Sequence, residues 1–294
     1  MSADASTAAT AATSVSADVL ERLHGTRGFV FDLDGTLVLG DKSNAGLRAL
    51  PGAIEFTREL TRRGLPFVIF TNGTVRTPEQ YAEKLRALGF PVEERMVLTP
   101  ASVAAEYLVR HKLRRVLVFG GQGITAPLQA AGLTTLLPSD ARSDVDAIFI
   151  GWYREFGIEG LELACEAAWG GARIFAASLA PFYATAEGRA LGTSRAIAAM
   201  ITSMTGRRAS VLGKPALPAL RVAARRLALP CTALAVVGDD PALEVPMAHR
   251  GGALAIAVHS GLGGAQAFDA LPEAARPHLA VRDIAQLQAV YGQR

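Results

Sequence analysis

The chain has 294 residues, of which 50% are hydrophobic and 19% are charged, and its formal net charge is +3. This composition predicts a globular protein with two domains or one large core, and no apolar run reaches the roughly 18 to 20 residues of a membrane span. The positive charge is mostly scattered arginine, so nucleic-acid binding is not expected. The composition and the distribution of charge therefore predict that neither a membrane nor a nucleic acid is a partner.

Residues 1–17 are rich in Ala, Ser and Thr and lack both a basic start and an apolar block. This pattern predicts a disordered tail and does not resemble a secretory signal. Cys165 and Cys231 are far apart and have no metal-ligand spacing, so they are interpreted as thiols in a reducing compartment. Both features predict a cytoplasmic protein.

A helix near residues 19–23 precedes the first predicted strand, the apolar run Gly28 to Phe31. Asp32 and Asp34 follow it, and the alternation of a strand would direct both carboxylates to one side. Mg²⁺ would offset their repulsion, since it prefers hard oxygen ligands. Gly35 then lets the backbone turn away. An ordinary turn at Asp-Gly is the alternative interpretation.

Helices and strands alternate in the next part of the chain. A helical pattern follows residues 51–53 and ends at Gly64, the strand 66–70 ends in Thr71-Asn72, and a helix opened by Pro78 ends before Gly89. This order predicts a parallel sheet with helices on both faces. Ligands bind such sheets at the carboxyl ends of the strands, where both Asp32 and Thr71 are placed.

A second α/β pattern begins at Val97 and continues to about Ala209. It comprises predicted helices at 100–111, 160–169 and 193–205, strands at 115–119, 147–150 and 173–177, and a loop at 178–192. The glycine cluster at residues 120–123 does not match the Gly-x-Gly-x-x-Gly motif and is interpreted as a plain strand-to-helix turn. The segment has about 110 residues, which is enough for a core of its own.

The chain after about residue 210 again alternates strands and helices and carries polar residues at strand ends and turns, as residues 28–96 do. Lys214 follows a glycine and precedes a proline, a helix is predicted at 218–227, and the strand 233–237 leads into Gly238-Asp239-Asp240. A further strand at 253–258 and a helix at 284–291 complete the chain. Two acids at the tip of a buried strand are costly without a partner, so Asp239 and Asp240 are candidate ligands.

Four separated pieces thus carry a polar group at a strand end or a glycine turn: Asp32/Asp34, Thr71/Asn72, Lys214 and Asp239/Asp240. Phosphoryl transfer through an aspartyl-phosphate requires such a set. One carboxylate attacks, a second acid moves protons, and a metal and a lysine neutralise the phosphoryl oxygens. Taken alone, Thr71-Asn72-Gly73 and Gly213-Lys214-Pro215 are more typical of ordinary surface turns, whereas the two acids after the buried strand 233–237 are a stronger signal. Found together in this order, the four pieces argue against a chance match.

These motifs, in this order, resemble those of the haloacid dehalogenase (HAD) superfamily of phosphohydrolases. The likeness is greatest to class IIA, which includes p-nitrophenylphosphate, phosphoglycolate and pyridoxal-phosphate phosphatases, and it covers residues 28–261. It implies an α/β fold: a doubly wound, Rossmann-like parallel-sheet core of residues 18–96 and 210–294, with an α/β cap domain inserted at 97–209. The implied activity is Mg²⁺-dependent hydrolysis of a small phosphorylated metabolite.

The resemblance also implies a role for each motif residue. Asp32 would be the nucleophile and a metal ligand, and Asp34 the general acid/base, with its backbone carbonyl as a further metal ligand. Thr71, the backbone near Asn72, and Lys214 would bind the phosphate. Asp239 would complete the metal site.

The sequence departs from the family pattern in the fourth motif, usually Gly-Asp-x-x-x-Thr-Asp. Leu243 and Glu244 occupy its last two places, so either Glu244 or Asp240 could supply the second acid. The cap departs as well, with Ser178-Leu179-Ala180-Pro181 after its third strand; Trp152 and Tyr153 are interpreted as cap core or a dimer surface. The substrate therefore cannot be copied from a relative.

Two further expectations follow from the resemblance and its departures. Capped relatives often pair through their caps, which makes a homodimer one expectation for this chain. The altered motif also motivates an alternative function, a catalytically drifted protein of the same fold that binds a phosphorylated ligand without hydrolysing it.

Overall fold

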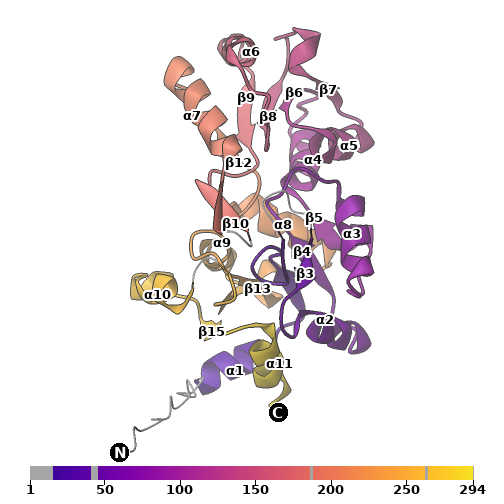
Figure 1. The fold of residues 1–294 in the computed structure, drawn as a ribbon, viewed down its shortest axis with the longest axis vertical. Coiled ribbons are helices and arrows are strands. Elements are labelled where there is room, and N and C mark those ends of the chain that lie inside the picture. The colour runs from indigo at the N-terminus through magenta and orange to yellow at the C-terminus, as the bar shows by residue number, and fades with distance from the viewer. Residues whose placement is uncertain (1–15, 41–45, 186–187, 262–263, 294) are drawn as a thin grey trace, which may run out of the picture.

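The computed structural model describes residues 16–40, 46–185, 188–261 and 264–293. The disordered tail predicted at residues 1–17 thus lies outside the described residues except for its last two. Ser16 caps helix α1 (Ala17–His24), and Ala17 begins it. Two parallel sheets dominate the molecule, one above the other in Figure 1.

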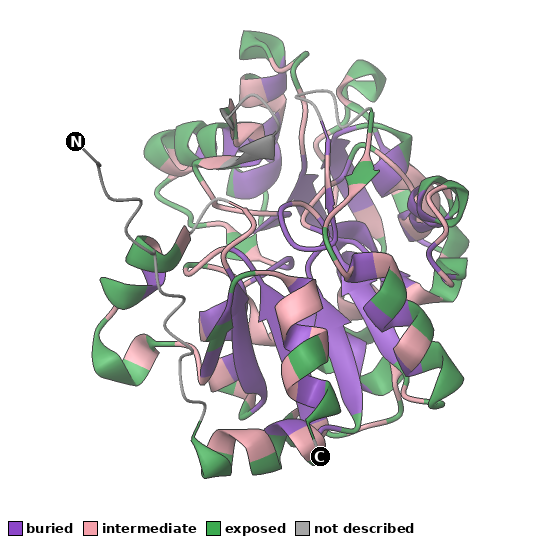
Figure 2. Cartoon of the chain, turned by 60° about the horizontal axis from the view of Figure 1, so that its bottom comes forward, coloured by how far each residue is buried: buried purple, intermediate pink, exposed green. Residues whose placement is uncertain are grey.

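The lower sheet has six parallel strands in the order β15-β14-β13-β1-β4-β5. Their side chains are almost all buried, as expected for a sheet that helices cover on both faces (Figure 2). The strands are β1 (Gly28–Phe31), β4 (Phe67–Phe70), β5 (Val97–Leu98), β13 (Leu234–Gly238), β14 (Leu254–Val258) and β15 (Leu279–Val281).

Helices pack on both faces of this sheet. One apolar cluster joins it to α1, α2 (Ala53–Arg62), α3 (Pro78–Ala87) and α11 (Ile284–Gly292). A second joins its other face to α4 (Pro100–Arg110), α8 (Leu217–Arg226) and α9 (Glu244–Gly251). The doubly wound α/β core predicted from the sequence is confirmed.

The upper sheet has five parallel strands in the order β12-β9-β8-β6-β7. They are β6 (Arg115–Phe119), β7 (Thr134–Leu136), β8 (Ala147–Ile150), β9 (Arg173–Ala176) and β12 (Ser210–Val211). Helices α6 (Ile158–Trp169) and α7 (Thr193–Thr205) cover one face, and α4 and α5 (Gln122–Ala130) cover the other. Helix α4 also packs on α8, so it joins the cap to the core.

Strand pairing refines the limits of the inserted segment. Strand β5, expected in the cap, pairs with β4 of the lower sheet, whereas β12, expected in the core, pairs with β9 of the upper one. We therefore propose that the chain enters the cap after Leu98 and returns after Val211. Where a loop was expected at residues 178–192, β10 (Phe182–Thr185) and β11 (Gly188–Leu191) form an antiparallel hairpin.

The described part of the chain also contains the short antiparallel hairpin of β2 (Val38–Leu39) and β3 (Arg48–Ala49), helix α10 (Gly264–Asp269) and four short 3-10 helices, Glu94–Met96, Pro138–Asp140, Cys231–Ala233 and Glu273–Ala275. In the described part of the chain, no helix combines the length and the apolar character needed to cross a bilayer.

Candidate active site

Three adjacent strands of the lower sheet, β4, β1 and β13, deliver the predicted motifs to one edge. Parallel strands end at the same edge, which explains why segments distant in sequence meet there. The loop after β12 adds Lys214 from the side of the cap. A cavity of about 230 Å³ at this edge is lined by all six predicted site residues: Asp32, Asp34, Thr71, Asn72, Lys214 and Asp239.

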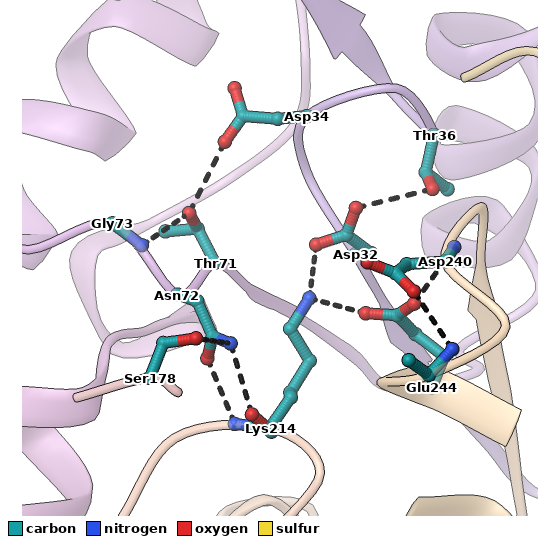
Figure 3. Close-up of polar contacts among 11 residues, drawn as sticks. Asp32, Asp34, Thr36, Thr71, Asn72, Gly73, Ser178, Lys214, Asp240 and Glu244 are labelled. Atoms are coloured by element: carbon teal, nitrogen blue, oxygen red, sulfur yellow. Dashed lines mark hydrogen bonds and ion pairs between the residues drawn. The ribbon is translucent and has the colours of Figure 1, made fainter. Parts of the chain in front are cut away.

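Asp32 lines this cavity and contacts both Lys214 and Thr36 (Figure 3). Strand β1 ends at Phe31, as the apolar run predicted, and the Asp32 N–H extends the pairing by donating to the Val237 carbonyl at 2.8 Å. One carboxylate oxygen of Asp32 forms an ion pair with Lys214 Nζ, and the other accepts from Thr36 Oγ1 at 3.3 Å. Both oxygens are thereby held in a fixed orientation.

Asp34 lies beyond the β1 tip, where the backbone turns at Gly35 with a φ of 91°. Its Oδ2 accepts from Thr71 Oγ1 at 3.3 Å, and Thr71 Oγ1 in turn accepts from the Gly73 N–H at 2.9 Å. Burial, followed by the nearby Asp32 charge, raises the pKa of Asp34 to about 7. A carboxyl group with such a pKa can donate and accept a proton near neutral pH.

Lys214 is buried with only 2% of its surface exposed, and it is fixed at both ends. Its Nζ contacts Asp32 and lies 2.7 Å from Glu244 Oε1. Burial opposes the charge of Lys214, but the carboxylates of Asp32 and Glu244 outweigh this and raise its pKa. Its backbone is held by Asn72, whose Oδ1 accepts from the Lys214 N–H at 2.8 Å and whose Nδ2 donates to the Lys214 carbonyl at 3.1 Å.

The Asn72 side chain therefore orients the lysine loop (Figure 3). Its Nδ2 also reaches Ser178 Oγ of the cap at 3.5 Å. For the Thr71-Asn72 motif, the sequence predicted that backbone N–H groups near Asn72 bind the phosphate, and this phosphate-binding role stays a prediction. The sequence did not reveal the pairing with Lys214, because 142 positions separate the two residues.

The structure separates the two candidates for the second acid. Glu244 is the first residue of α9; its Oε1 faces Lys214, and its Oε2 accepts from the Asp240 N–H at 3.2 Å. Burial raises the pKa of Glu244 to about 7. Asp240 instead uses Oδ1 to accept from the Ala242 N–H at 2.8 Å, which caps its own loop. Glu244 is thus the acid that reaches the centre of the site.

Asp239 lies at the tip of β13 and is 2% exposed. Gly35 and Gly261 enclose its carboxylate so closely that a Cβ at either glycine would collide with it. Among the described residues, no three Asp, Glu, His or Cys side chains are grouped around one metal position. The predicted donors are two carboxylates and one backbone carbonyl, all hard oxygens, and Mg²⁺ usually keeps several waters, so this donor set fits Mg²⁺.

The cap forms the roof of the cavity. The Trp152 N–H donates to Thr74 Oγ1 at 2.8 Å, and the Trp152 side chain belongs to the cavity lining. The interpretation of Trp152 as cap core did not foresee this place in the cavity lining, which arises because the end of β8 faces the loop after β4. Its alternative as a dimer surface stays a prediction. Tyr153 does pack against the cap core, as expected.

Two further residues of the site were not singled out from the sequence. Thr36 donates a hydrogen bond to Asp32. The sequence signal for this contact was a hydroxyl side chain two residues after Asp34. Tyr81 lies on α3. It is fully buried, and its hydroxyl, which has no hydrogen-bond partner among the described residues, lies against Gly73 in the cavity lining.

Comparison with known proteins agrees with this architecture. A family model described as haloacid dehalogenase-like hydrolase matches residues 29–134, and a second HAD-hydrolase-like model matches residues 211–287. The chain is 30% identical over 215 residues to an acid sugar phosphatase of Staphylococcus haemolyticus, which covers 72% of this chain and 77% of that protein. It is 28% identical over 237 residues to the 5'-nucleotidase YutF of Bacillus subtilis, covering 80% and 88% respectively.

The fold likeness extends over nearly the whole chain. The structure of a 4-nitrophenylphosphatase from Thermotoga maritima superposes with a TM-score of 0.81, over 92% of this chain and 99% of that one, at 24% identity. The matches to the two family models and to the relatives together span the core, the inserted cap and all four motifs. The chain belongs to the haloacid dehalogenase-like hydrolases, as the resemblance of its motifs predicted.

Proposed function

We propose that this protein is a Mg²⁺-dependent phosphatase that hydrolyses a small phosphomonoester through a phosphorylated Asp32. The observation that carries the proposal is the orientation of Asp32 in the cavity. Lys214 and Thr36 hold its two oxygens, and Asp34, with a pKa raised to about 7, lies two residues further along, beyond the tip of the same strand. The names of the similar proteins, a sugar phosphatase and a 5'-nucleotidase, agree with phosphomonoester hydrolysis.

The reaction uses two displacements at phosphorus. An oxygen of Asp32 attacks, the bond from phosphorus to the ester oxygen breaks, and Asp34 gives its proton to the leaving oxygen. A water molecule then attacks the aspartyl-phosphate, Asp34 takes a proton from this water, and inorganic phosphate leaves as Asp32 regains its carboxylate. Lys214 stabilises the charge on the transferring group, and Thr71 orients Asp34 through its hydroxyl.

The carboxylates of Asp32 and Asp239 and the backbone carbonyl of Asp34 would hold Mg²⁺. The ion supplies charge neutralisation for the phosphoryl oxygens next to the nucleophile. Removal of divalent cations by a chelator should therefore abolish turnover, and added Mg²⁺ should restore it.

The direct test is phosphate release from 4-nitrophenyl phosphate with Mg²⁺. Asp32→Asn should lower turnover by about 10⁴-fold, because an amide cannot form the acyl phosphate. Asp269→Asn, at an exposed position of α10, is the matched control and should behave as the unaltered protein. Turnover by Asp32→Asn near the unaltered level would contradict the proposal. Binding of a phosphate analogue without hydrolysis of any phosphomonoester would instead support the drifted, ligand-binding alternative.

We also propose a cytoplasmic location and a small phosphorylated metabolite as the partner. The two cysteines support the location, since both are free. Pairing of two chains through the cap stays a prediction.

A further inference from the structure

A second cavity, of about 560 Å³, adjoins the active-site cavity. The two cavities have Ala180, Phe182, Asp240 and Leu243 as shared walls. The cap contributes one side through the hairpin β10–β11 and helix α7, and the core contributes the other through the loop after β13. The second cavity is therefore the space next to the active site into which a group attached to a phosphate at Asp32 would extend, between the cap and the core.

Two arginines from the cap line this second cavity. The Arg189 guanidinium lies 4.2 Å from the centroid of the Phe182 ring, an arrangement that holds a cation over an aromatic face. Arg195 donates one Nη1 hydrogen bond to the Leu179 carbonyl at 3.0 Å. Within the described ranges, neither arginine forms an ion pair with a carboxylate.

Each guanidinium therefore keeps donors for a ligand. A guanidinium carries five N–H donors in a planar fork that suits a carboxylate or a phosphate. The only described carboxylate in the wall belongs to Asp240, which accepts from the Ala242 N–H and lies on the side shared with the active site. The rest of the lining is mainly apolar, including Pro181, Val211 and Ala267. A ligand with an anionic group next to Arg189 and Arg195 would complement this distribution of charge.

We infer that the second cavity binds the leaving part of the substrate and that Arg189 and Arg195 select a second anionic group on it. The substrate class is thus a phosphomonoester whose leaving part has an apolar or aromatic body and ends in a carboxylate or a further phosphate. This inference rests on the proposed phosphatase function. It adds a specificity determinant that lies outside the motifs shared by the family.

Two isosteric probes separate charge from shape: 4-carboxyphenyl phosphate and 4-carbamoylphenyl phosphate. The unaltered protein should hydrolyse the anionic probe with about tenfold higher kcat/KM, which corresponds to one good charge-assisted hydrogen bond. Arg189→Gln and Arg195→Gln should each reduce this preference, and the double variant should abolish it through KM. The matched control is Arg208→Gln, an exposed cap residue outside both cavities, which should keep the preference.

The outcomes separate the two proposals. Hydrolysis of neither probe, nor of 4-nitrophenyl phosphate, would contradict the phosphatase function itself. Hydrolysis of both probes with equal kcat/KM, unchanged in the arginine variants, would overturn the second-anion inference and leave the phosphatase function standing. A preference that survives in the double variant would place the determinant elsewhere and would also overturn the inference.

Discussion

Lys214 carries one positive charge between two buried carboxylates, those of Asp32 and Glu244. Removing one member of such a set leaves the others without full compensation, which is more costly than the loss of an exposed ion pair. Glu244 replaces the aspartate usual in the family. Its longer side chain packs against Gly238, where a Cβ would collide with it, and this packing directs Oε1 to the lysine.

Glu244→Gln should therefore lower kcat for 4-nitrophenyl phosphate by at least about tenfold, because Lys214 loses one of its two charged partners. Asp240→Asn is the matched comparison. It keeps an oxygen for the Ala242 N–H and should stay within about threefold of the unaltered protein. Steady-state kinetics of both variants measure this. A larger loss for Asp240→Asn than for Glu244→Gln would make Asp240 the second acid of the site.

At the scale of elements, helix α5 of the cap packs directly on the loop that follows β4. Gly123 lies so close to this loop that an added Cβ would be 2.8 Å from Arg76 N and would collide with the Thr74 carbonyl. The same loop carries Thr71 and Asn72, so this backbone contact couples the position of the cap to the geometry of the site, together with the hydrogen bond from the Trp152 N–H to Thr74 Oγ1. Gly121, at the N-cap of α5, has open space around it.

Gly123→Ala should lower the free energy of unfolding by about 2 kcal/mol, because the neighbours that must move are backbone atoms. Inside a helix, alanine is otherwise favoured over glycine by about 1 kcal/mol, so a net loss can only come from the collision. Gly121→Ala should stay within about 0.5 kcal/mol. Urea unfolding of both variants tests this, and equal stability of the two would show that the contact between α5 and the loop is unimportant.

The sequence predicted elements and motifs whose signals are local. The buried strands are continuous apolar runs, and Asp32, Thr71 and Asp239 immediately follow them. The hairpin β10–β11 was missed because it contains charged residues and alanines without a clear alternating pattern. The partners of Lys214 were missed for another reason. Asn72 and Glu244 meet the lysine only after the sheet is assembled, so no spacing in the sequence reports the contact.

At the scale of the whole molecule, one apolar cluster runs from the lower sheet through α4 into the upper sheet. The cap and the core therefore do not have fully separate cores, and the site lies where they meet. Both sheets should therefore unfold together. The protonation of a single buried group should then change the free energy of unfolding of the whole molecule with pH.

His278 is such a group, just before β15. Its Nδ1 accepts from the Ala255 N–H at 2.9 Å, and its ring lies 4.8 Å from that of His249. Burial, with Arg22 and His249 as nearby positive groups, lowers the pKa of His278 to about 4, whereas Asp18 acts weakly in the opposite direction. The unfolded chain, with a pKa near 6.5, binds the proton more readily. Stability contributed by His278 is therefore lost as the pH falls from about 6.5 to about 4.

Replacing His278 by Asn removes this titration but keeps an oxygen that can accept from the Ala255 N–H. Between pH 7 and pH 5 the unaltered protein should lose about 1 kcal/mol more stability than His278→Asn, a value reduced because the half-buried ring is partly screened by water. Urea unfolding at the two pH values measures the difference directly. Parallel losses in the two proteins would show that the proton taken up on acid unfolding binds elsewhere, and that the surroundings of the Ala255 N–H in β14 tolerate a charged imidazole.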